Sequence, residues 1–260
     1  MTKDIQVAVI TGAASGIGRA CAIRLASNGL YVGLLDLNES EAVKVQSTIE
    51  QHGGKALFIQ CNIAKGEDVQ QAFNKVMSEW GKVDVVCANA GIAGTLSPIE
   101  SMSEEEWDTT MSVNVKGTFL TVKHAIPHLK MQGGSIIITS SVSGNRMFSQ
   151  AGFAAYSTSK ASQVAFMKMA ALELAKYKIR VNAICPGAIE TNIGESIEAS
   201  PSVKNIEIPI SFPEGDQPLE HGPGQPEQVA DLVEFLASPE SAHITGTEIY
   251  IDGGESLLRG

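Results

Sequence analysis

The 260-residue chain lacks any apolar run near the ~20 residues that a membrane-spanning helix needs. It also lacks a basic run: 19 Lys and Arg stand against 29 Asp and Glu, and the formal net charge is −10. Proteins that bind nucleic acid or anionic membranes usually carry a basic patch, so this chain lacks their electrostatic footprint. We therefore expect neither nucleic acid nor a membrane as a partner.

Cysteine is scarce, and no two cysteines form a C-x-x-C pair. The four are Cys21, Cys61, Cys87 and Cys185, each in or beside an apolar segment. Buried free thiols in a reducing compartment are the simplest interpretation. The N-terminus runs straight into a predicted strand without the apolar region of a signal peptide, which predicts a cytoplasmic protein.

Seven short apolar runs alternate with helical patterns along the chain. The predicted strands are 5–10, 30–35, 56–59, 83–87, 135–139, 179–184 and 248–251. The predicted helices are 17–27, 39–51, 69–80, 103 to about 132, 154–176 and 226–238. Continuous rather than alternating apolar strands are typical of a parallel sheet that is covered on both faces. The pattern predicts an α/β fold: one domain over 1–260 with a doubly wound, seven-stranded parallel sheet.

Two segments depart from this regular alternation. The long helix should start at a capping box formed by Ser103 and Glu106, and Pro127 should bend it or end it early. Residues 192–225 hold five of the ten prolines and no convincing regular element. Because ligands bind at the carboxyl ends of such sheets, we expect a substrate lid at about 191–225.

Gly12, Gly16 and Gly18 lie between the first predicted strand and the first predicted helix. Glycine permits a tight turn and a close approach of backbone N–H groups to phosphate, beside the positive end of a helix. An ordinary glycine-rich turn is the alternative. The order of strand, loop and helix favours a site for a dinucleotide pyrophosphate.

Asp36 ends the second predicted strand, where a carboxylate can accept both hydroxyls of an adenosine ribose and repel a 2′-phosphate. Leu37 follows it where an arginine would suit a phosphate, and Ser15 rather than a basic residue precedes Gly16. These residues favour NAD over NADP. The alternative is that Asp36 only caps the next helix.

Tyr156 and Lys160 are four residues apart and so share a face of one predicted helix. An ammonium and a positive nicotinamide ring would lower the phenol pKa from its usual value of about 10. Tyr156 could then exchange a proton with an alcohol or ketone near neutral pH. A solvent-exposed pair with this spacing is common by chance, so the context decides.

Further motifs follow the other predicted strands. They are Asn89-Ala90-Gly91, Asn114 in Met111-Ser-Val-Asn114, Ser140-Ser141, Pro186-Gly187 with Ile189 and Thr191, and Asp252-Gly253-Gly254. Together with the G-x-x-x-G-x-G loop, this set resembles the short-chain dehydrogenase/reductase family along essentially the whole chain. The resemblance implies a Rossmann fold and an oxidoreductase that transfers hydride between a nicotinamide cofactor and a CH–OH group.

The resemblance implies roles for a catalytic set of Asn114, Ser141, Tyr156 and Lys160. Ser141 would orient the substrate oxygen, Lys160 would bind the nicotinamide ribose, and Asn114 would position a water in a proton relay. The implied cofactor-binding residues are Gly12, Ser15, Gly16, Ile17, Gly18, Asp36, Leu37, Asn62, Ile63, Asn89, Ala90, Gly91, Tyr156, Lys160, Pro186, Gly187, Ile189 and Thr191.

Three positions depart from the family pattern. The serine usually lies 13 residues before the tyrosine, which is the place of Ser143, whereas Ser141 lies 15 before. We favour Ser141 because it ends the strand and because residues 144–152 could hold an insertion. Ser143 is the alternative catalytic serine. Asn62 replaces the usual acidic residue near the adenine, and Ala88 replaces an asparagine.

His124 and His128 have a spacing that metal ligands use, but no third ligand is evident nearby, so we expect no metal. By resemblance the chain should form a homotetramer through helices 111–129 and 154–175.

The predicted lid is acidic, which bears on the substrate. It carries Glu195, Glu198, Glu207, Glu214, Asp216 and Glu220, with Lys204 as its only Lys or Arg. An acyl carrier protein or acyl-CoA should meet basic residues, and only Arg146 could bind a carboxylate. We expect a neutral small substrate such as a sugar, polyol or hydroxyketone. A 3-oxoacyl-thioester reductase is the alternative chemistry, and a non-catalytic NAD-binding regulator is the alternative of another class.

Overall fold

The protein is built around a parallel sheet, shown by a computed structural model that describes residues 5–148, 150–209, 211–213 and 215–259. Within these residues, seven strands pair in the order β3-β2-β1-β4-β5-β6-β7. The strands are β1 (Val7–Thr11), β2 (Tyr31–Asp36), β3 (Lys55–Gln60), β4 (Val85–Ala88), β5 (Gly134–Thr139), β6 (Ile179–Pro186) and β7 (Glu248–Ile251). The predicted fold class is confirmed.

The order of the strands reverses at β1. The chain builds β2 and β3 on one side of β1 and then returns to place β4 on its other side. The connections that leave β1 and β4 therefore diverge at their carboxyl ends. In a doubly wound sheet this is the point at which a ligand-binding crevice forms.

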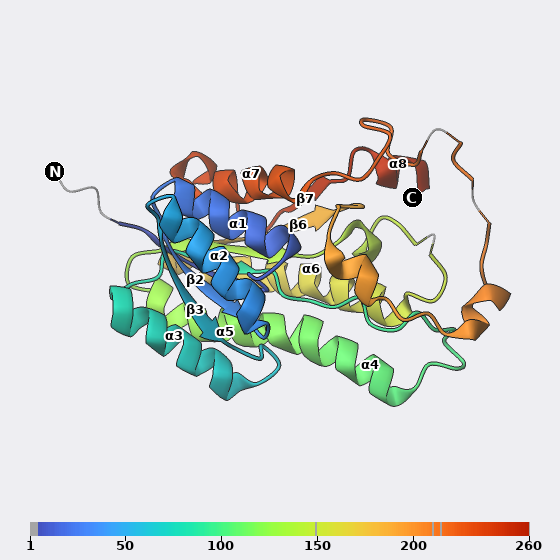
Figure 1. Ribbon diagram of the computed structural model, residues 1–260, viewed down its shortest axis with the longest axis horizontal. Coiled ribbons are helices and arrows are strands. Elements are labelled where there is room, and N and C mark those ends of the chain that lie inside the picture. The colour runs from blue at the N-terminus through green and yellow to red at the C-terminus, as the bar shows by residue number, and fades with distance from the viewer. Residues whose placement is uncertain (1–4, 149, 210, 214, 260) are drawn as a thin grey trace.

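Helices cover both faces of the sheet (Figure 1). One layer contains α1 (Gly16–Ser27), α2 (Glu39–Gln51) and α7 (Pro226–Ala237). The other contains α3 (Gly66–Trp80), α5 (Gly117–Leu129) and α6 (Ala154–Leu174). Both faces of the sheet are thus buried, as the continuous apolar strands predict.

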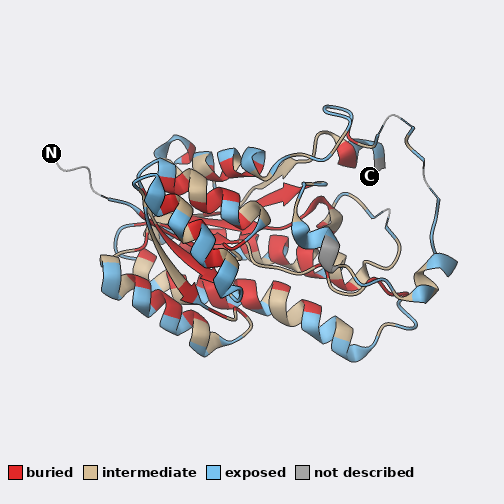
Figure 2. Cartoon of the chain, in the orientation of Figure 1, coloured by how far each residue is buried: buried red, intermediate tan, exposed pale blue. Residues whose placement is uncertain are grey.

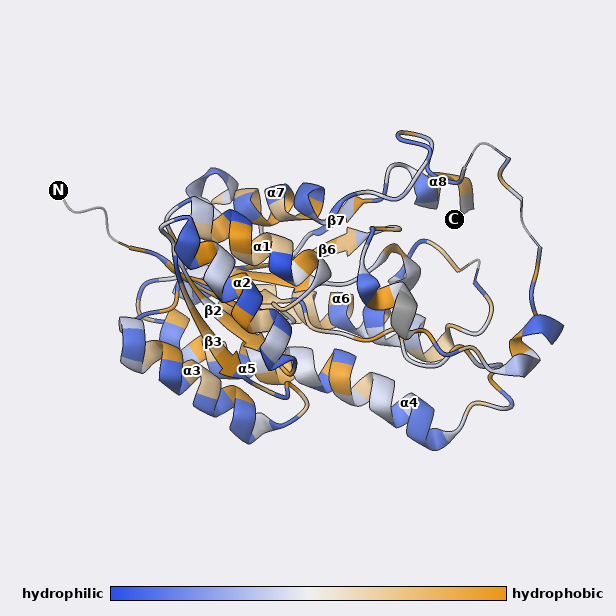
Figure 3. Cartoon of the chain, in the orientation of Figure 1, coloured by the Kyte–Doolittle hydropathy of each residue, from blue (hydrophilic) through white to orange (hydrophobic). Residues whose placement is uncertain are grey.

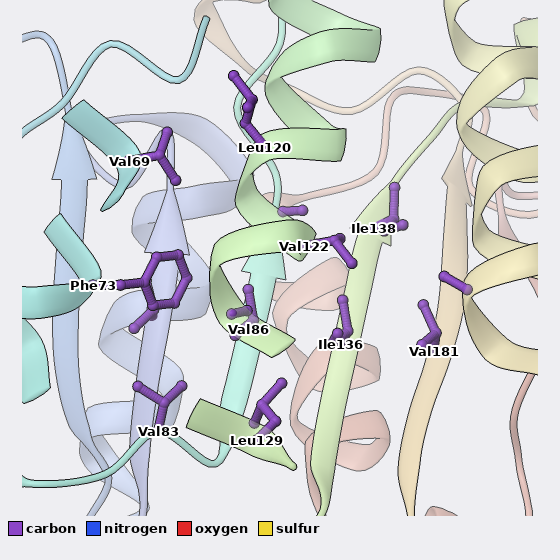
Figure 4. Close-up of a cluster of buried hydrophobic side chains, with 14 of the residues drawn as sticks. Val69, Phe73, Val83, Val86, Leu120, Val122, Leu129, Ile136, Ile138 and Val181 are labelled. Atoms are coloured by element: carbon purple, nitrogen blue, oxygen red, sulfur yellow. The ribbon is translucent and has the colours of Figure 1, made fainter. Parts of the chain in front are cut away.

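Each helix layer encloses its own hydrophobic cluster against the sheet. Figure 4 shows part of one cluster, to which α3 contributes Phe73, α5 contributes Leu129, and β4 and β5 contribute Val86 and Ile136. Buried residues are concentrated in the strands and on the inner faces of the helices (Figure 2). The same strands are the most hydrophobic part of the chain (Figure 3). Burial of apolar side chains on both faces therefore stabilises the sheet and holds its strands in place.

The predicted long helix after residue 103 is divided into three parts. The capping box is present: Ser103 Oγ accepts from Glu106 N–H, and the Glu106 carboxylate accepts from Ser103 N–H. The part α4 (Glu104–Met111) leads into a π-helical segment (Ser112–Lys116) and then into α5. Pro127 lies inside α5, which ends at Leu129. The π-helical segment was not predicted.

Several other boundaries differ from the predictions. The first strand begins at Val7 instead of residue 5, and α3 begins at Gly66 instead of residue 69, since the polar first turn of α3 hides it from an apolar pattern. The segment from 191 to 225 contains two short 3-10 turns, Asn192–Ser196 and Pro201–Asn205. A short C-terminal helix, α8 (Glu255–Arg259), was not predicted.

The Phe73 ring fills the interior between α3 and the sheet and is 1% exposed. Replacing Phe73 by Ala should destabilise the protein by about 3–5 kcal/mol, because the apolar contact is lost and a cavity remains. Urea unfolding followed by circular dichroism measures this change. Met131→Ala is the control, since Met131 is 91% exposed at the end of α5, and it should change the free energy of unfolding by less than about 0.5 kcal/mol. Equal effects in both variants would contradict this packing.

Candidate active site

The side chain of Asn89 links the carboxyl ends of three neighbouring strands. Its amide nitrogen donates to the carbonyls of Thr11 (3.1 Å) and Gly12 (3.4 Å), and its amide oxygen accepts from Thr139 Oγ1 (3.1 Å). Thr11 Oγ1 in turn accepts from the backbone N–H groups of Asn89 and Ala90, both at 3.0 Å. The ends of β1, β4 and β5 are therefore held at a common point.

The glycine loop lies beside this point and is packed too closely for side chains. Gly12 and Gly16 have positive φ angles of 65° and 49°, which L-residues rarely adopt. A Cβ on Gly18 would lie 2.0 Å from the Gly12 carbonyl oxygen, and one on Gly16 would lie 3.1 Å from the Thr191 side chain. The loop opens onto the N-terminus of α1, where free N–H groups and the helix dipole favour an anion.

The Asp36 carboxylate is oriented by two backbone N–H groups at the end of β2. It accepts from Ala14 of the glycine loop at 2.9 Å and from Asn38 at 2.9 Å. Asn38, not Asp36, caps α2, because its side chain accepts from Glu41 N–H. The alternative that Asp36 only caps this helix is therefore wrong.

Lys160 is buried in α6, with 3% of its surface exposed, and its Nζ donates to the Thr139 carbonyl at 2.9 Å. The Nζ lies 5.6 Å from the centre of the Tyr156 ring. Burial lowers the Lys160 pKa to about 8. This ammonium is therefore charged at neutral pH and close to its titration point, which is typical of functional lysines.

The phenol of Tyr156 reaches the cavity but is otherwise surrounded by protein. This burial raises its pKa, and a hydrogen bond with Ser141 lowers the pKa in part. From the sequence, the Lys160 ammonium and a bound nicotinamide ring were expected to lower the Tyr156 pKa. In the protein alone, desolvation of the phenolate is the larger effect.

The geometry distinguishes the two candidate serines. Ser141 forms the hydrogen bond with Tyr156, and its Oγ also accepts from the backbone N–H of Ser143 at 3.2 Å. Ser143 follows in a short 3-10 turn (Val142–Gly144) and also lines the cavity. Of the two, Ser141 is the one joined to the phenol.

Asn114 lies in the π-helical segment and is fully buried. Its side-chain amide donates to the Ile92 carbonyl and to Ser159 Oγ, both at 2.9 Å, and accepts from Ile92 N–H at 2.9 Å. Ser159 Oγ donates to the Tyr156 carbonyl at 2.7 Å. Asn114 thus ties the chain after β4 to the second turn of α6.

The chain after β6 packs against two acidic residues beyond β7, Asp252 and Glu255, and is hydrogen-bonded to the second. Glu255 accepts from Ala188 N–H at 3.0 Å and is almost completely buried. A Cβ on Gly187 would lie 2.7 Å from Asp252 Cβ and 2.7 Å from Glu255 Oε2. The family pattern drew attention to Asp252, but Glu255 was missed because it lies in the short helix that was not predicted.

These elements surround one cavity of about 800 Å³. Of the sequence-predicted residues, the following line it: Gly12, Ser15, Gly16, Ile17, Asp36, Leu37, Asn62, Ile63, Asn89, Ala90, Gly91, Ser141, Tyr156, Lys160, Pro186, Gly187, Ile189 and Thr191. Gly18 and Asn114 lie behind this lining. The cavity is also lined by residues that were not predicted individually as site residues: Leu35, Cys61, Ile92, Ala93, Val113, Thr139, Ser140, Val142, Met147, Gln150, Phe153, Ala188, Asn192, Ile193, Ile197, Asp216 and Glu255.

Arg146 does not line the cavity, so the expectation that it could receive a substrate carboxylate is wrong. Its guanidinium stacks on the Tyr250 ring at 3.5 Å, because the loop turns it toward β7. Of the acidic lid residues with described side chains, Asp216 alone lines the cavity. Glu214 lies outside the described residues, and so does the side chain of Glu195.

Histidines and cysteines were also considered from the sequence, and the structure shows what surrounds them. The His128 ring stacks on Phe73 at 5.9 Å. Across the described residues, no group of three His, Cys, Asp or Glu side chains could hold a metal ion. Cys21, Cys61, Cys87 and Cys185 are buried and free. No helix in the described part of the chain has the length and apolar character needed to cross a membrane.

The Lys160 pKa yields a direct test of the site. In protein labelled with ¹³C-lysine, one lysine Cε signal should titrate with a midpoint of about 8 as the ammonium loses its proton with rising pH. The Lys160→Met variant should lack this signal and keep the others. If every lysine stayed charged up to about pH 10, the described burial of Lys160 would be wrong.

Comparisons with known proteins place this geometry in a family. A family model described as enoyl-(acyl carrier protein) reductase matches residues 12–256. A 3beta-hydroxysteroid dehydrogenase of Mediterraneibacter gnavus is 32% identical, with 96% of this chain and 95% of that protein covered. The structure of a 3-ketoacyl-ACP reductase from Sinorhizobium meliloti superimposes with a TM-score of 0.92 at 42% identity, covering 97% of this chain and all of the other.

A 3-ketoacyl-(acyl-carrier-protein) reductase from Brucella melitensis was solved as a complex with NADH. It superimposes with a TM-score of 0.84 at 32% identity, covering 96% of this chain and 98% of that one. These similarities extend over nearly the whole of each chain. The chain belongs to the short-chain dehydrogenase/reductase family of NAD(P)-dependent oxidoreductases.

Proposed function

We propose that this protein is an NAD-dependent oxidoreductase that interconverts a neutral secondary alcohol and its ketone. The observation that supports it most is the meeting of Tyr156, Ser141 and Lys160 with the glycine loop and Asp36 in one cavity. A phenol, a hydroxyl and an ammonium can manage the proton of an alcohol. A regulator that only sensed the cofactor would need the glycines and Asp36 but not this group.

The cavity fits a nicotinamide dinucleotide. A Cβ on Gly12 would lie 2.9 Å from Ala90 Cα, so the turn packs closely against the chain after β4. Gly12 and Gly16 line the cavity without a side chain, which lets a ligand approach their backbone. Gly12, Gly16 and the N-terminus of α1 would hold the pyrophosphate, Asp36 the adenosine ribose, and Lys160 the nicotinamide ribose. When bound, the nicotinamide accepts or supplies the hydride.

Tyr156 is the proposed acid and base. In oxidation, its deprotonated oxygen would take the proton of the substrate hydroxyl; in reduction, the phenol would give a proton to the carbonyl oxygen. Ser141 would hold the same substrate oxygen by a hydrogen bond. The Lys160 ammonium would favour the phenolate electrostatically, against the burial that raises the Tyr156 pKa.

Asn114 and Lys160 border a small space that could carry the proton onward. A Cβ on Gly91 would lie 3.1 Å from Asn114 Oδ1 and 3.5 Å from Lys160 Nζ, so only a glycine leaves both polar atoms accessible there. We propose that Asn114 acts here by holding a water next to Lys160. Its amide nitrogen is fully used by Ile92 and Ser159, and Oδ1 accepts from Ile92 N–H, so the second lone pair of Oδ1 is the one available for this role.

A 3-oxoacyl-thioester reductase is the second candidate, and the names of the structural relatives favour it. The described side chains of the lid disfavour it, since Glu198, Glu207 and Glu220 are exposed there with Lys204 as a single cation. An acyl carrier protein is acidic and would be repelled by such a surface. We therefore place the neutral substrate first.

The proposed assembly is a homotetramer through α4–α5 and α6. Phe119, Met169 and Leu172 expose large apolar side chains on these helices. The Phe119 ring also packs edge-on against Phe166 of α6, with centres 6.2 Å apart. An apolar face that spans two adjacent helices suits a symmetric contact between copies.

Replacing Tyr156 by Phe tests the proposed chemistry. Turnover with NAD across a panel of secondary alcohols should fall at least about 100-fold, because the proton acceptor is removed. Binding of NADH, followed by its fluorescence, should be unchanged. Tyr31→Phe removes a hydroxyl on the strand β2 and should keep full activity. Retained turnover in Tyr156→Phe would exclude this mechanism, and no turnover of any alcohol or ketone by the parent would favour the regulator.

The double variant Asp36→Ser, Leu37→Arg tests the choice of cofactor. The ratio of kcat/KM for NAD over NADP should fall by about 100-fold, corresponding to about 2.7 kcal/mol, because a repelling carboxylate is replaced and a phosphate-binding cation is added. Glu39→Ala removes an exposed charge at the start of α2 and should leave the ratio unchanged. A parent enzyme that already prefers NADP would contradict the assigned role of Asp36.

A further inference from the structure

The part of the cavity beyond Tyr156 is bordered by chain segments from three regions: residues 92–97, residues 141–148 with 150–153, and residues 191–200. Backbone hydrogen bonds join them directly. Leu96 N–H donates to the Glu198 carbonyl at 2.8 Å, and Ser200 N–H donates to the Leu96 carbonyl at 2.8 Å. Ser97 N–H donates to the Gly152 carbonyl at 3.1 Å. We call this part the substrate compartment.

The lid is also held at its base. Glu190 N–H donates to the Gly224 carbonyl at 2.8 Å, and Gly224 N–H donates to the Ala188 carbonyl at 3.0 Å. The two ends of the lid are thus joined to each other, and near residue 199 the lid is joined to the segment around Leu96. The substrate compartment is therefore shaped before a substrate arrives, and it favours a ligand that already fits it.

The side chains that line the substrate compartment are mostly apolar. They include Val142, Met147, Phe153, Ile193 and Ile197. The Phe153 ring lies next to the reacting phenol, with its centre 5.2 Å from that of Tyr156 and a tilt of 48°. A hydroxyl group pressed against these side chains would lose its water without gaining a hydrogen bond, which is unfavourable.

Few polar side chains line the substrate compartment apart from Ser141 and Tyr156. They belong to Ser143, Gln150 and Asn192, of which the last two are exposed. Of the described residues that line the whole cavity, Lys160 alone is basic, and its ammonium already donates to Thr139. Asp216 also lines the cavity and would repel a carboxylate.

From this lining we infer that the substrate is an uncharged carbocyclic alcohol or ketone that has one reacting oxygen on an otherwise unsubstituted ring. A flat or chair-shaped carbocycle can rest against Phe153 and Met147 while its oxygen reaches Tyr156 and Ser141. This inference rests on the proposed function and narrows it: among neutral substrates, the sugars and polyols expected from the sequence are disfavoured.

Two alcohols with the same ring test the inference. Cyclohexanol has one hydroxyl on a six-membered carbocycle, and myo-inositol has one on every carbon of that ring. With NAD, kcat/KM for cyclohexanol should exceed that for myo-inositol by at least about 100-fold, because the extra hydroxyls lose their water in the apolar compartment. Equal values, or a preference for myo-inositol, would overturn the inference.

Open-chain alcohols distinguish a failure of the inference from a failure of the proposed function. If neither ring is oxidised but an open-chain secondary alcohol or polyol is, in a reaction that Tyr156→Phe abolishes, the carbocyclic class is wrong and the proposed function stands. If no alcohol is oxidised and no ketone is reduced, both fail.

Met147 offers a matched pair of variants. Met147→Gln keeps nearly the same size and adds an amide to the substrate compartment, so kcat/KM for cyclohexanol should fall at least about 10-fold while the Kd for NADH stays unchanged. Met131→Gln makes the same change at an exposed position and should have no effect. Melting temperatures of both variants show whether they fold.

Ile197→Asn provides a second variant on the lid side of the substrate compartment, in case Met147→Gln unfolds. It should also lower kcat/KM for cyclohexanol and reduce the preference over myo-inositol. Folded variants that both keep the parent preference would overturn the assignment of this compartment as the ring site.

Discussion

The hydrogen bonds of one side chain, Asn89, hold together what the rest of the site needs. Its amide joins β1, through the Thr11 and Gly12 carbonyls, to β5, through the Thr139 hydroxyl. The Thr139 carbonyl then accepts from Lys160. The loop that favours an anion and the ammonium beside the phenol are thus positioned by the same strand ends. Parallel pairing brings these ends together, and the amide sets their separation.

Burial of the Lys160 ammonium is unfavourable by itself, because it removes a charge from water. The hydrogen bond from Nζ to the Thr139 carbonyl offsets part of this cost. Desolvation lowers the Lys160 pKa to about 8, so this ammonium is charged at neutral pH and loses its proton just above it. Desolvation also raises the Tyr156 pKa, because it disfavours the phenolate. The first shift brings the Lys160 pKa nearer to neutral, whereas the second moves the Tyr156 pKa further from it. The site is therefore electrostatically incomplete in the protein alone, and a positive ring next to the phenol would favour the phenolate.

The sequence predicted those features that depend on local pattern. Continuous apolar strands, glycine positions and the Tyr156–Lys160 spacing each follow from a few neighbouring residues, so the sheet and the catalytic helix could be located. The π-helical segment around Asn114 could not, because its hydrogen bonds to Ile92 and Ser159 connect distant parts of the chain. The expected role of Arg146 was wrong for the same reason, because its contact with Tyr250 depends on how the fold places β7 next to that loop.

The division between predictable and unpredictable residues also separates chemistry from selectivity. The reacting groups lie at strand ends and on α6, where regular elements hold them rigidly. The substrate compartment is made by connecting loops, whose residues can change without altering the sheet. Relatives of similar identity accordingly bear names that refer to a steroid and to an acyl carrier protein. Family membership therefore specifies an NAD(P)-dependent oxidoreductase, whereas Met147 and Phe153, which we propose contact the substrate, lie in the variable loops.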